Sequence, residues 1–300
     1  MKHSFILCLI LIFANNARAQ NDSINPEHPL PISTSAYLMT DTTKPADPHR
    51  YKIRPWVDIP YTIVADAYAL WGMSVIYGRD TTPRSEILAL NPNNVNSFDR
   101  PVTKNYSEKA KNASDKFFYG SMPLPLLMLI DKKIRKDGLR VGLLYLEAMG
   151  TTGVFYTTAA MLASRYRPYA YNNSLDIGTR QRGGAKNSFY AGHVALVGTS
   201  TFFISKVLSD YHPEWGAKKW IFYTLAAGAT ATTAYLRVRA GQHFKSDVLV
   251  GAIMGPTVGI LVPHIHKNKD FSGNRLSLSP RMGLDGSTGF TAVYRLGRNL

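Results

Sequence analysis

The chain has 300 residues, of which 45% are apolar and 18% are charged, and its formal net charge at pH 7 is +15. A balance this basic favours anionic partners, namely nucleic acid, an anionic membrane surface or phosphorylated substrates. The sequence carries no zinc-finger spacing and no RNA-binding aromatic signature, so we expect no nucleic-acid partner. The one cysteine, Cys8, lies in the N-terminal apolar segment, which excludes a disulfide framework and thiolate chemistry in the rest of the chain.

The N-terminal residues 1–19 are typical of a secretory signal peptide. Lys2 supplies a basic start, Phe5 to Phe13 an apolar stretch, and Ala17-Arg18-Ala19 a cleavage site. We therefore expect a protein exported from a bacterial cytoplasm. Residues 20–55 are rich in Pro, Asp, Thr and Ser, a composition that predicts a disordered or extended leader.

Six apolar segments follow, separated by polar stretches that include a short surface helix predicted over residues 105–117. They predict an all-α fold of about six helices. The segments are Ile59–Gly78, Phe117–Ile130, Val141–Ala163, His193–Leu208, Trp220–Leu236 and Asp247–Pro263.

The tail, residues 266–300, differs in kind because polar and apolar residues alternate around Asp285-Gly286. That pattern predicts a short β-hairpin. A frayed polar tail is the alternative that the same residues allow.

The length of the apolar segments and the charge of the loops between them bear on whether the bundle inserts into a membrane. A span needs roughly 20 apolar residues, which three of the six segments reach marginally and Phe117–Ile130 does not. If that short segment only dips into the bilayer, the basic stretch 131–140 faces the cytoplasm, and the loops 164–189 and 237–246 both face outward, in agreement with the positive-inside rule. We favour a bundle embedded in or associated with the cytoplasmic membrane and facing the periplasm over a soluble periplasmic domain.

Three stretches carry groups suited to phosphate chemistry. In "RVRAGQHFKSD", His243 and Asp247 stand four residues apart, so on a helix the carboxylate could fix the tautomer of the ring. Taken alone, an HxxxD pair is more often an ordinary contact on a helix surface. The stretch "SRYRPYAY" places Arg165 and Arg167 after a long helix, where guanidinium groups suit phosphate oxygens or simply satisfy helix carbonyls.

The third stretch, "NSFYAGHVAL", opens an apolar helix with Gly192-His193. A glycine at a helix start exposes backbone amides that can bind an anion, although it can equally be a simple cap. A histidine at this place could donate a proton to a leaving group.

The order of these pieces resembles the type 2 phosphatidic acid phosphatase and haloperoxidase superfamily. Its pattern is Lys-x6-Arg-Pro, then Pro-Ser-Gly-His, then Ser-Arg-x5-His-x3-Asp. Arg167-Pro168 matches the end of the first block and Gly192-His193 the end of the second. Arg237, His243 and Asp247 match the third at its full spacing. The resemblance covers about residues 56–265 and implies that they form an antiparallel helical bundle.

Four positions depart from the pattern. Ala160 stands where the family has lysine, Tyr190-Ala191 where it has Pro-Ser, and Leu236 where it has serine. Arg165 could replace the missing lysine, and Lys186 or Ser188 could replace the missing hydroxyl. Because losing one transition-state donor typically costs about 10²–10³ in rate, these changes could slow a phosphatase without abolishing it.

The resemblance implies a phosphomonoesterase that needs no metal or other cofactor and forms a phosphohistidine. His243 would be the nucleophile, Asp247 would orient it, and His193 would act as acid and base. Phosphate would be held by Arg167, Arg237, the Gly192 amide and Arg165. The expected substrate is a lipid phosphate at the bacterial membrane. The alternatives are a soluble periplasmic acid phosphatase and, given the four departures, a non-catalytic phosphate- or lipid-binding membrane protein.

Overall fold

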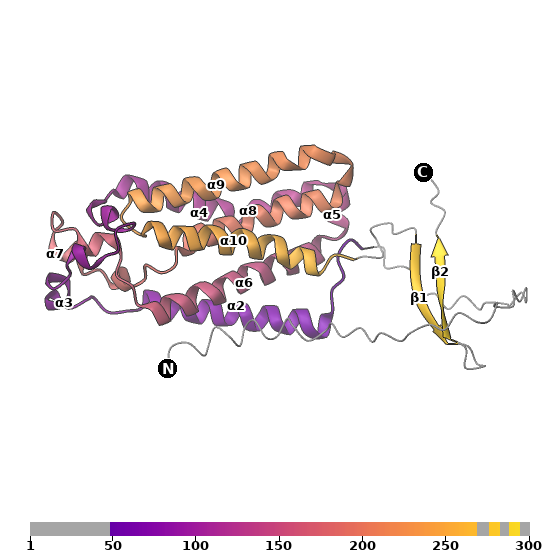
Figure 1. Cartoon of the computed structure of the whole chain (residues 1–300), viewed down its shortest axis with the longest axis horizontal. Coiled ribbons are helices and arrows are strands. Elements are labelled where there is room, and N and C mark those ends of the chain that lie inside the picture. Colours follow the sequence, from indigo (N-terminus) through magenta and orange to yellow (C-terminus); the bar gives the residue numbers. More distant parts are fainter. Residues whose placement is uncertain (1–48, 269–275, 283–287, 295–300) are drawn as a thin grey trace, which may run out of the picture. The chain divides into compact units, whose positions relative to one another are not determined.

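A computed structural model describes residues 49–268, 276–282 and 288–294 of the chain. This part is mostly helical, as the sequence predicts (Figure 1). The predicted signal peptide and residues 20–48 of the predicted leader lie outside the described residues. Residues 51–54 lead into the first long helix, and Tyr51 is buried and forms an isolated antiparallel bridge with Lys267.

Among the described residues, five helices have 20 or more residues: α2 (Pro55–Tyr77), α6 (Gly138–Ala163), α8 (Gly192–Tyr211), α9 (Lys219–Arg239) and α10 (Lys245–Ile265). A sixth, α4 (Glu108–Ser121), has 14 residues, and α3 (Arg84–Leu88), α5 (Lys132–Lys136) and α7 (Ile177–Arg180) are short. Short 3₁₀ segments join them at Pro92–Asn94, Arg100–Lys104, Leu124–Ile130, Pro168–Tyr171, Gly183–Lys186 and Pro213–Lys218.

The predicted segment Phe117–Ile130 is not one helix. Its first residues end α4, and a 3₁₀ segment, Leu124–Ile130, follows. Pro123 and Pro125 explain the break, because a proline lacks the amide hydrogen and clashes with the preceding turn. The polar segment before it forms α4, whose first turn is capped by the Ser107 hydroxyl accepting from the Ala110 amide at 3.2 Å.

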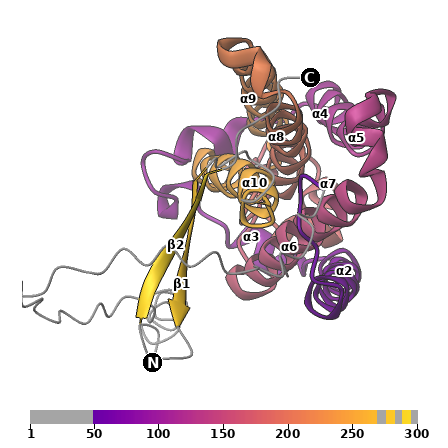
Figure 2. The same ribbon diagram turned by 90° about the vertical axis from the view of Figure 1, so that its right-hand side faces the viewer.

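The helices α8 and α10 form the centre of the helical part, with α9 beside α8 and with α6 between the centre and α2 (Figure 2). Glycines let α8 and α10 approach closely. A Cβ atom on Gly251, Gly255 or Gly259 would lie 2.7, 2.1 or 2.5 Å from the carbonyl oxygen of Ala191, just before α8, or of Ala195 or Thr199 within it. Small residues at a spacing of four form one stripe along a helix and permit this contact. The stripe therefore sets the start of α8 against the start of α10.

Outside the helical part, strands β1 (Leu276–Met282) and β2 (Thr288–Tyr294) pair antiparallel, with Ser279 opposite Thr291. The turn predicted at Asp285-Gly286 lies outside the described residues.

Large apolar side chains are exposed along the outer faces of the long helices. On α2 they include Trp56, Ile63, Val64 and Leu70, each more than 60% exposed. Within the described residues, two helices, α2 and α10, are long and apolar enough to cross a membrane. The helices α6 and α9, whose segments the sequence marks as marginal spans, do not reach that threshold. An apolar outer surface of this extent marks an interaction with lipid or with another protein.

Candidate active site

A cavity of about 350 Å³ lies at one end of the long helices, where α6 ends and α8 begins. Seven elements or loops supply its walls. It is lined by Met73 and Tyr77 of α2, Lys111, Asp115, Phe118 and Tyr119 of α4, Tyr156 of α6, Arg167, Gly192, His193 and Leu196, Arg237 of α9, and Gln242.

Backbone hydrogen bonds join the three motif-bearing loops beside this cavity. The Arg167 amide donates to Ala185 at 2.7 Å, and the Ala191 amide donates to Asp247 at 3.2 Å. The loop before α10 turns at Gly241, whose φ is +67° and where a Cβ would lie 2.2 Å from the Asn105 carbonyl oxygen. Only glycine suits both the positive φ and the contact.

Two arginines at the cavity are buried and incompletely paired. Arg167 is 6% exposed and Arg237 is 2% exposed. Arg167 donates to the Gln242 side chain, and Arg237 donates to Asp115 at 2.9 Å and to Ser114 at 3.2 Å. The Nε atoms of both arginines have no hydrogen-bond partner within the described part of the chain. Burial, together with the positive charge of Arg167, lowers the pKa of Arg237 to about 10.

His243 is 1% exposed and is not among the residues that line the cavity, although the adjacent Gln242 is. Its Nδ1 atom lies 2.6 Å from the Ser188 carbonyl oxygen. Since a carbonyl oxygen can only accept, Nδ1 carries the proton and Nε2 keeps a free lone pair. Burial lowers the pKa of His243 well below its usual value, and the charges of Arg167 and Arg237 lower it further. The ring is therefore neutral and nucleophilic at pH 7.

His193 occupies the first turn of α8, with its Nε2 atom 3.2 Å from Asp115 Oδ1. Burial and the charge of Arg237 lower the pKa of His193 to about 4, although Asp115 opposes them. A bound anion would add negative charge beside this ring and raise its pKa, which is the direction that a proton donor requires.

Gly192 begins α8, and the helix has no side-chain cap. A Cβ atom at this position would lie 2.7 Å from the Tyr156 ring, so the close contact requires glycine. The first-turn amides of an uncapped helix are unsatisfied donors and favour an anion. Gly192 therefore lies where the sequence-based hypothesis needs it.

Two predicted roles do not agree with the geometry. Asp247 forms no hydrogen bond or ion pair with His243 in the described structure. It accepts from the Phe244 amide at 2.9 Å and from Ser188 at 2.6 Å, and it pairs with Arg165. The expected contact required both residues on one helix, but α10 begins at Lys245, so His243 precedes it. The group that orients the ring is the Ser188 carbonyl.

Arg165 is not among the residues that line the cavity, contrary to the prediction that it binds phosphate. Its guanidinium pairs with Asp99 at 2.8 Å and with Asp247, and it lies 4.3 Å from the centre of the Phe244 ring. These contacts neutralise its charge and tie the loop after α6 to the start of α10.

The positions that depart from the family pattern are also apolar or buried here. Ala160 packs with Ile76, Tyr156 and Tyr190, so its own side chain supplies no cation where the family has lysine. Lys186 pairs with Glu86 at 2.7 Å instead of reaching the cavity. Ser188 donates to Asp247, so its hydroxyl does not replace the missing donor.

Sequence analysis missed Lys111, Asp115 and Phe118, because their segment has the pattern of a solvated surface helix. Their spacing of four and three residues was the available signal, since such residues share one face of a helix. Asp99, in a 3₁₀-rich stretch without a motif, gave no signal at all, although it is fully buried.

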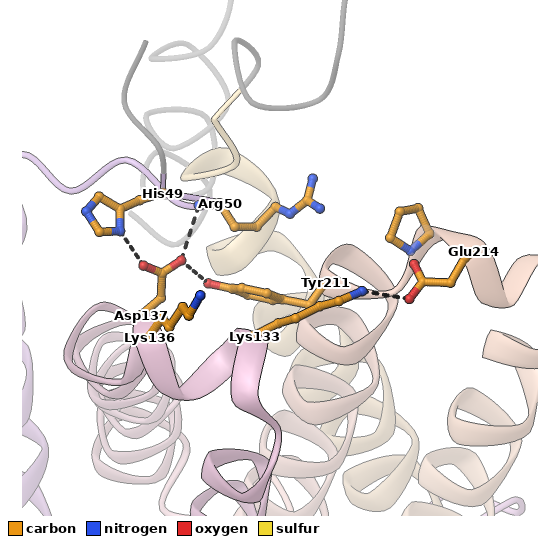
Figure 3. A pocket seen from close by; sticks show the side chains of 8 residues that line it. His49, Arg50, Lys133, Lys136, Asp137, Tyr211 and Glu214 are labelled. Carbon is orange, nitrogen blue, oxygen red and sulfur yellow. Dashed lines mark hydrogen bonds and ion pairs between the residues drawn. The ribbon is translucent and has the colours of Figure 1, made fainter. Parts of the chain in front are cut away.

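A second cavity, of about 580 Å³, lies at the other end of α6 (Figure 3). Both carboxylates of its lining, Asp137 and Glu214, are paired. Asp137 accepts from the Tyr211 hydroxyl at 2.6 Å and also contacts His49, while Lys133 pairs with Glu214 at 2.8 Å. This pairing is typical of a structural network.

The histidines outside the motifs stand in polar stretches of the sequence, which predicts surface positions, but two of them are buried. His212 is 9% exposed and bonded to Asp131 at 2.8 Å, and His266 is 4% exposed. His28 lies outside the described residues. Within the described part of the chain, no group of three or more His, Cys, Asp or Glu side chains is placed to hold a metal ion.

Comparison with known proteins decides the family. Residues 141–271 match the family model of the PAP2 superfamily. This segment belongs to the PAP2 superfamily. The resemblance predicted from the motifs is thus confirmed, and at the level of the family it supports a hydrolase of phosphoric monoesters. The helices α2 and α4 precede the matched segment.

A solved structure is also similar to this chain. It is the crystal structure of the first transmembrane PAP2 type phosphatidylglycerolphosphate phosphatase from Bacillus subtilis, at 18% sequence identity and a TM-score of 0.42. The match covers 68% of this chain and 95% of that one. A search of curated proteins gives no match.

Proposed function

We propose that this PAP2 superfamily protein is a phosphatase that removes the phosphate of a lipid phosphomonoester through a phosphohistidine on His243. The observation that carries the proposal is the pair of buried arginines, Arg167 and Arg237, beside two neutral histidines. A buried charge without a full set of partners is costly, and a bound anion would compensate it.

Charge supports a phosphate in this cavity. Lys111, Arg167 and Arg237 are cations, Asp115 is an anion, and both histidines are neutral at pH 7, so the lining has a net charge of +2. A phosphomonoester dianion balances that charge. The two unpartnered Nε atoms and the amides at the start of α8 are donors for its oxygens.

The reaction would have two steps. In the first, His243 Nε2 attacks phosphorus and the bond to the ester oxygen breaks, while His193 donates a proton to the departing oxygen. In the second, His193 takes a proton from water, the water oxygen attacks phosphorus, and the bond to His243 breaks. Arg167 and Arg237 stabilise the equatorial oxygens in both steps.

A lipid substrate is favoured by the surface around the helices. The exposed apolar side chains of α2 and α10 suit a bilayer, and those of α2 run to Tyr77, which lines the cavity. The basic residues 132–140 lie at the opposite end of α6. The positive-inside rule turns that end to the cytoplasm and the cavity outward. Export of the N-terminus would favour the reverse, because His49 contacts Asp137 at the same basic end.

The test is phosphate release from lipid and soluble phosphomonoesters by detergent-purified protein in excess chelator. The His243→Ala variant should lose release by about 10⁴-fold or more, because no other group replaces the nucleophile. A phosphoryl group trapped by acid-free denaturation should be found on the wild type only. His264→Ala is the matched control, since His264 is exposed on the last turn of α10 and far along the helix from the cavity.

Equal turnover by the His243→Ala variant and the wild type would contradict the phosphohistidine. A folded wild type that binds phosphate without any turnover would favour the second candidate, a non-catalytic phosphate- or lipid-binding protein. The observation behind that candidate is the apolar packing of Ala160 and the buried Ala191, which leaves the cavity with fewer donors than the family pattern has. Hydrolysis of soluble monoesters alone would favour an acid phosphatase.

A further inference from the structure

We propose that Asp115 of α4 occupies the anion position of the phosphate site, and that phosphate binds by displacing this carboxylate from Arg237 and His193. The proposal rests on the function proposed above, because it concerns the same cavity. It assigns a role to a helix that precedes the segment matching the superfamily.

The position of the carboxylate is that of a bound anion. Asp115 Oδ1 lies 2.9 Å from Arg237 Nη1 and 3.2 Å from His193 Nε2. These are ordinary distances for an oxygen of a phosphate held by the same two groups. One oxygen cannot share that place with another, so a phosphate that uses both groups has to remove Oδ1.

The remaining contacts of α4 keep the carboxylate in place. Asp115 Oδ2 accepts from Lys111 at 3.0 Å, one helical turn earlier. Phe118, on the same face, stacks against His193 with ring centres 4.3 Å apart. Lys111, Asp115 and Phe118 therefore form one stripe of α4 that closes the cavity. Lys111 can keep Oδ2 after Oδ1 is displaced, which holds the carboxylate near the site.

The electrostatics show that Asp115 is charged when it competes. Burial by itself would raise the pKa of Asp115. Hydrogen bonds from His193 and Lys111, together with the charge of Arg237, outweigh burial and hold this pKa well below its usual value. The side chain is 23% exposed, so the carboxylate can swing into solvent without a change of the fold.

The test is calorimetric binding of inorganic phosphate at pH 7.5 to the full chain. Asp115→Asn removes the competing charge and nearly preserves the shape, so it should bind phosphate about tenfold tighter than the wild type, about 1.4 kcal/mol. Glu108→Gln is the control, because it removes one negative charge from the same helix. Glu108 is exposed and pairs with Arg182, outside the cavity, so the affinity should stay within about twofold.

A second measurement uses the wild type alone. Saturating phosphate should speed amide hydrogen exchange in α4, because the helix loses its contacts with Arg237 and His193. Stronger protection of α4 would overturn the proposal.

The outcomes separate the two proposals. If the wild type binds phosphate and Asp115→Asn binds it no tighter, displacement is wrong and the phosphate site stands. If neither protein binds phosphate, both the displacement and the proposed function fail. If Asp115→Asn binds phosphate and the wild type does not, the result supports displacement, because the Asp115 carboxylate then outcompetes phosphate in the wild type.

Discussion

Replacing Arg167 by methionine separates a functional arginine from a structural one. Arg167 is 6% exposed, its one side-chain hydrogen bond goes to Gln242, and its Nε has no partner among the described residues. Methionine has a similar length and no charge. The substitution therefore removes a buried cation and leaves no buried anion behind, since Arg167 has no carboxylate partner in the described structure.

The expected magnitude follows from the cost of a buried charge. Replacing buried ionic groups by apolar ones of similar volume is commonly neutral or stabilising by about 1–4 kcal/mol. Because the cavity lining is partly polar, we expect Arg167→Met to fall at the lower end of this range, so the free energy of unfolding should rise by about 1–2 kcal/mol. For a domain of this size that raises the Tm by about 2–8 °C. Turnover should fall about 10²–10³-fold, because a donor to the transition state is lost.

The assay is thermal unfolding in detergent, with and without inorganic phosphate, beside phosphate release. Phosphate should raise the Tm of the wild type and leave that of Arg167→Met unchanged. Arg180→Met is the matched control. Arg180 is 5% exposed, but its guanidinium donates to the Ala170 and Ile87 carbonyl oxygens at 2.8 and 3.1 Å. Its loss leaves two buried acceptors unpaired and should cost about 2–4 kcal/mol. An Arg167→Met variant destabilised as much as Arg180→Met would refute the reasoning.

Two further predictions concern His193 and Gly192. The pKa of His193 is lowered to about 4, against about 6.5 in an unfolded chain, so the unfolded state binds the proton first as the pH falls. Stability should therefore be full above pH 6.5 and decline towards pH 4. Because the side chain is 17% exposed, His193→Gln should reduce that decline by only about 1–3 kcal/mol. The measurement is the free energy of unfolding against pH. An unchanged profile in the variant would contradict the lowered pKa of His193. Gly192→Ala should destabilise the protein by about 1–3 kcal/mol, because its Cβ meets the Tyr156 ring at 2.7 Å. Gly228→Ala in α9, where a Cβ meets nothing within 4 Å, should be neutral or stabilising by up to about 1 kcal/mol, and equal Tm changes in the two variants would show that the contact is tolerated.

The helices are the part of the fold that sequence reasoning predicted best. The segment Val141–Ala163 became α6, Gly138–Ala163, and Trp220–Leu236 became part of α9, Lys219–Arg239. Both are long apolar runs with polar ends, so the signal is local and survives without knowledge of the rest of the chain. The prediction of one helix over Phe117–Ile130 was wrong, because its prolines interrupt the helix despite the apolar composition of the segment.

For the motif residues too, the predictions that rest on short stretches of sequence agree with the structure better than those that rest on a contact between residues. The spacing of Arg237 and His243, and the glycine at the start of α8, are properties of short stretches, and they identified residues that the fold brings to one cavity or beside it. The expected contact between His243 and Asp247 was wrong because it assumed that both residues lie on one helix. The helix α10 begins only at Lys245, two residues after His243.

What only the tertiary structure decided is which charges meet. Asp115 contacts Arg237 and His193, which follow it in the chain by 122 and 78 positions. Arg165 is neutralised by Asp99, which precedes it by 66 positions. Sequence spacing carries no signal for such pairs, because they depend on how helices pack. The sequence by itself therefore determined the helices and the residue types at the cavity. Packing decided that Arg167 lines the cavity without a carboxylate partner among the described residues, whereas Arg165 pairs with Asp99 and Asp247.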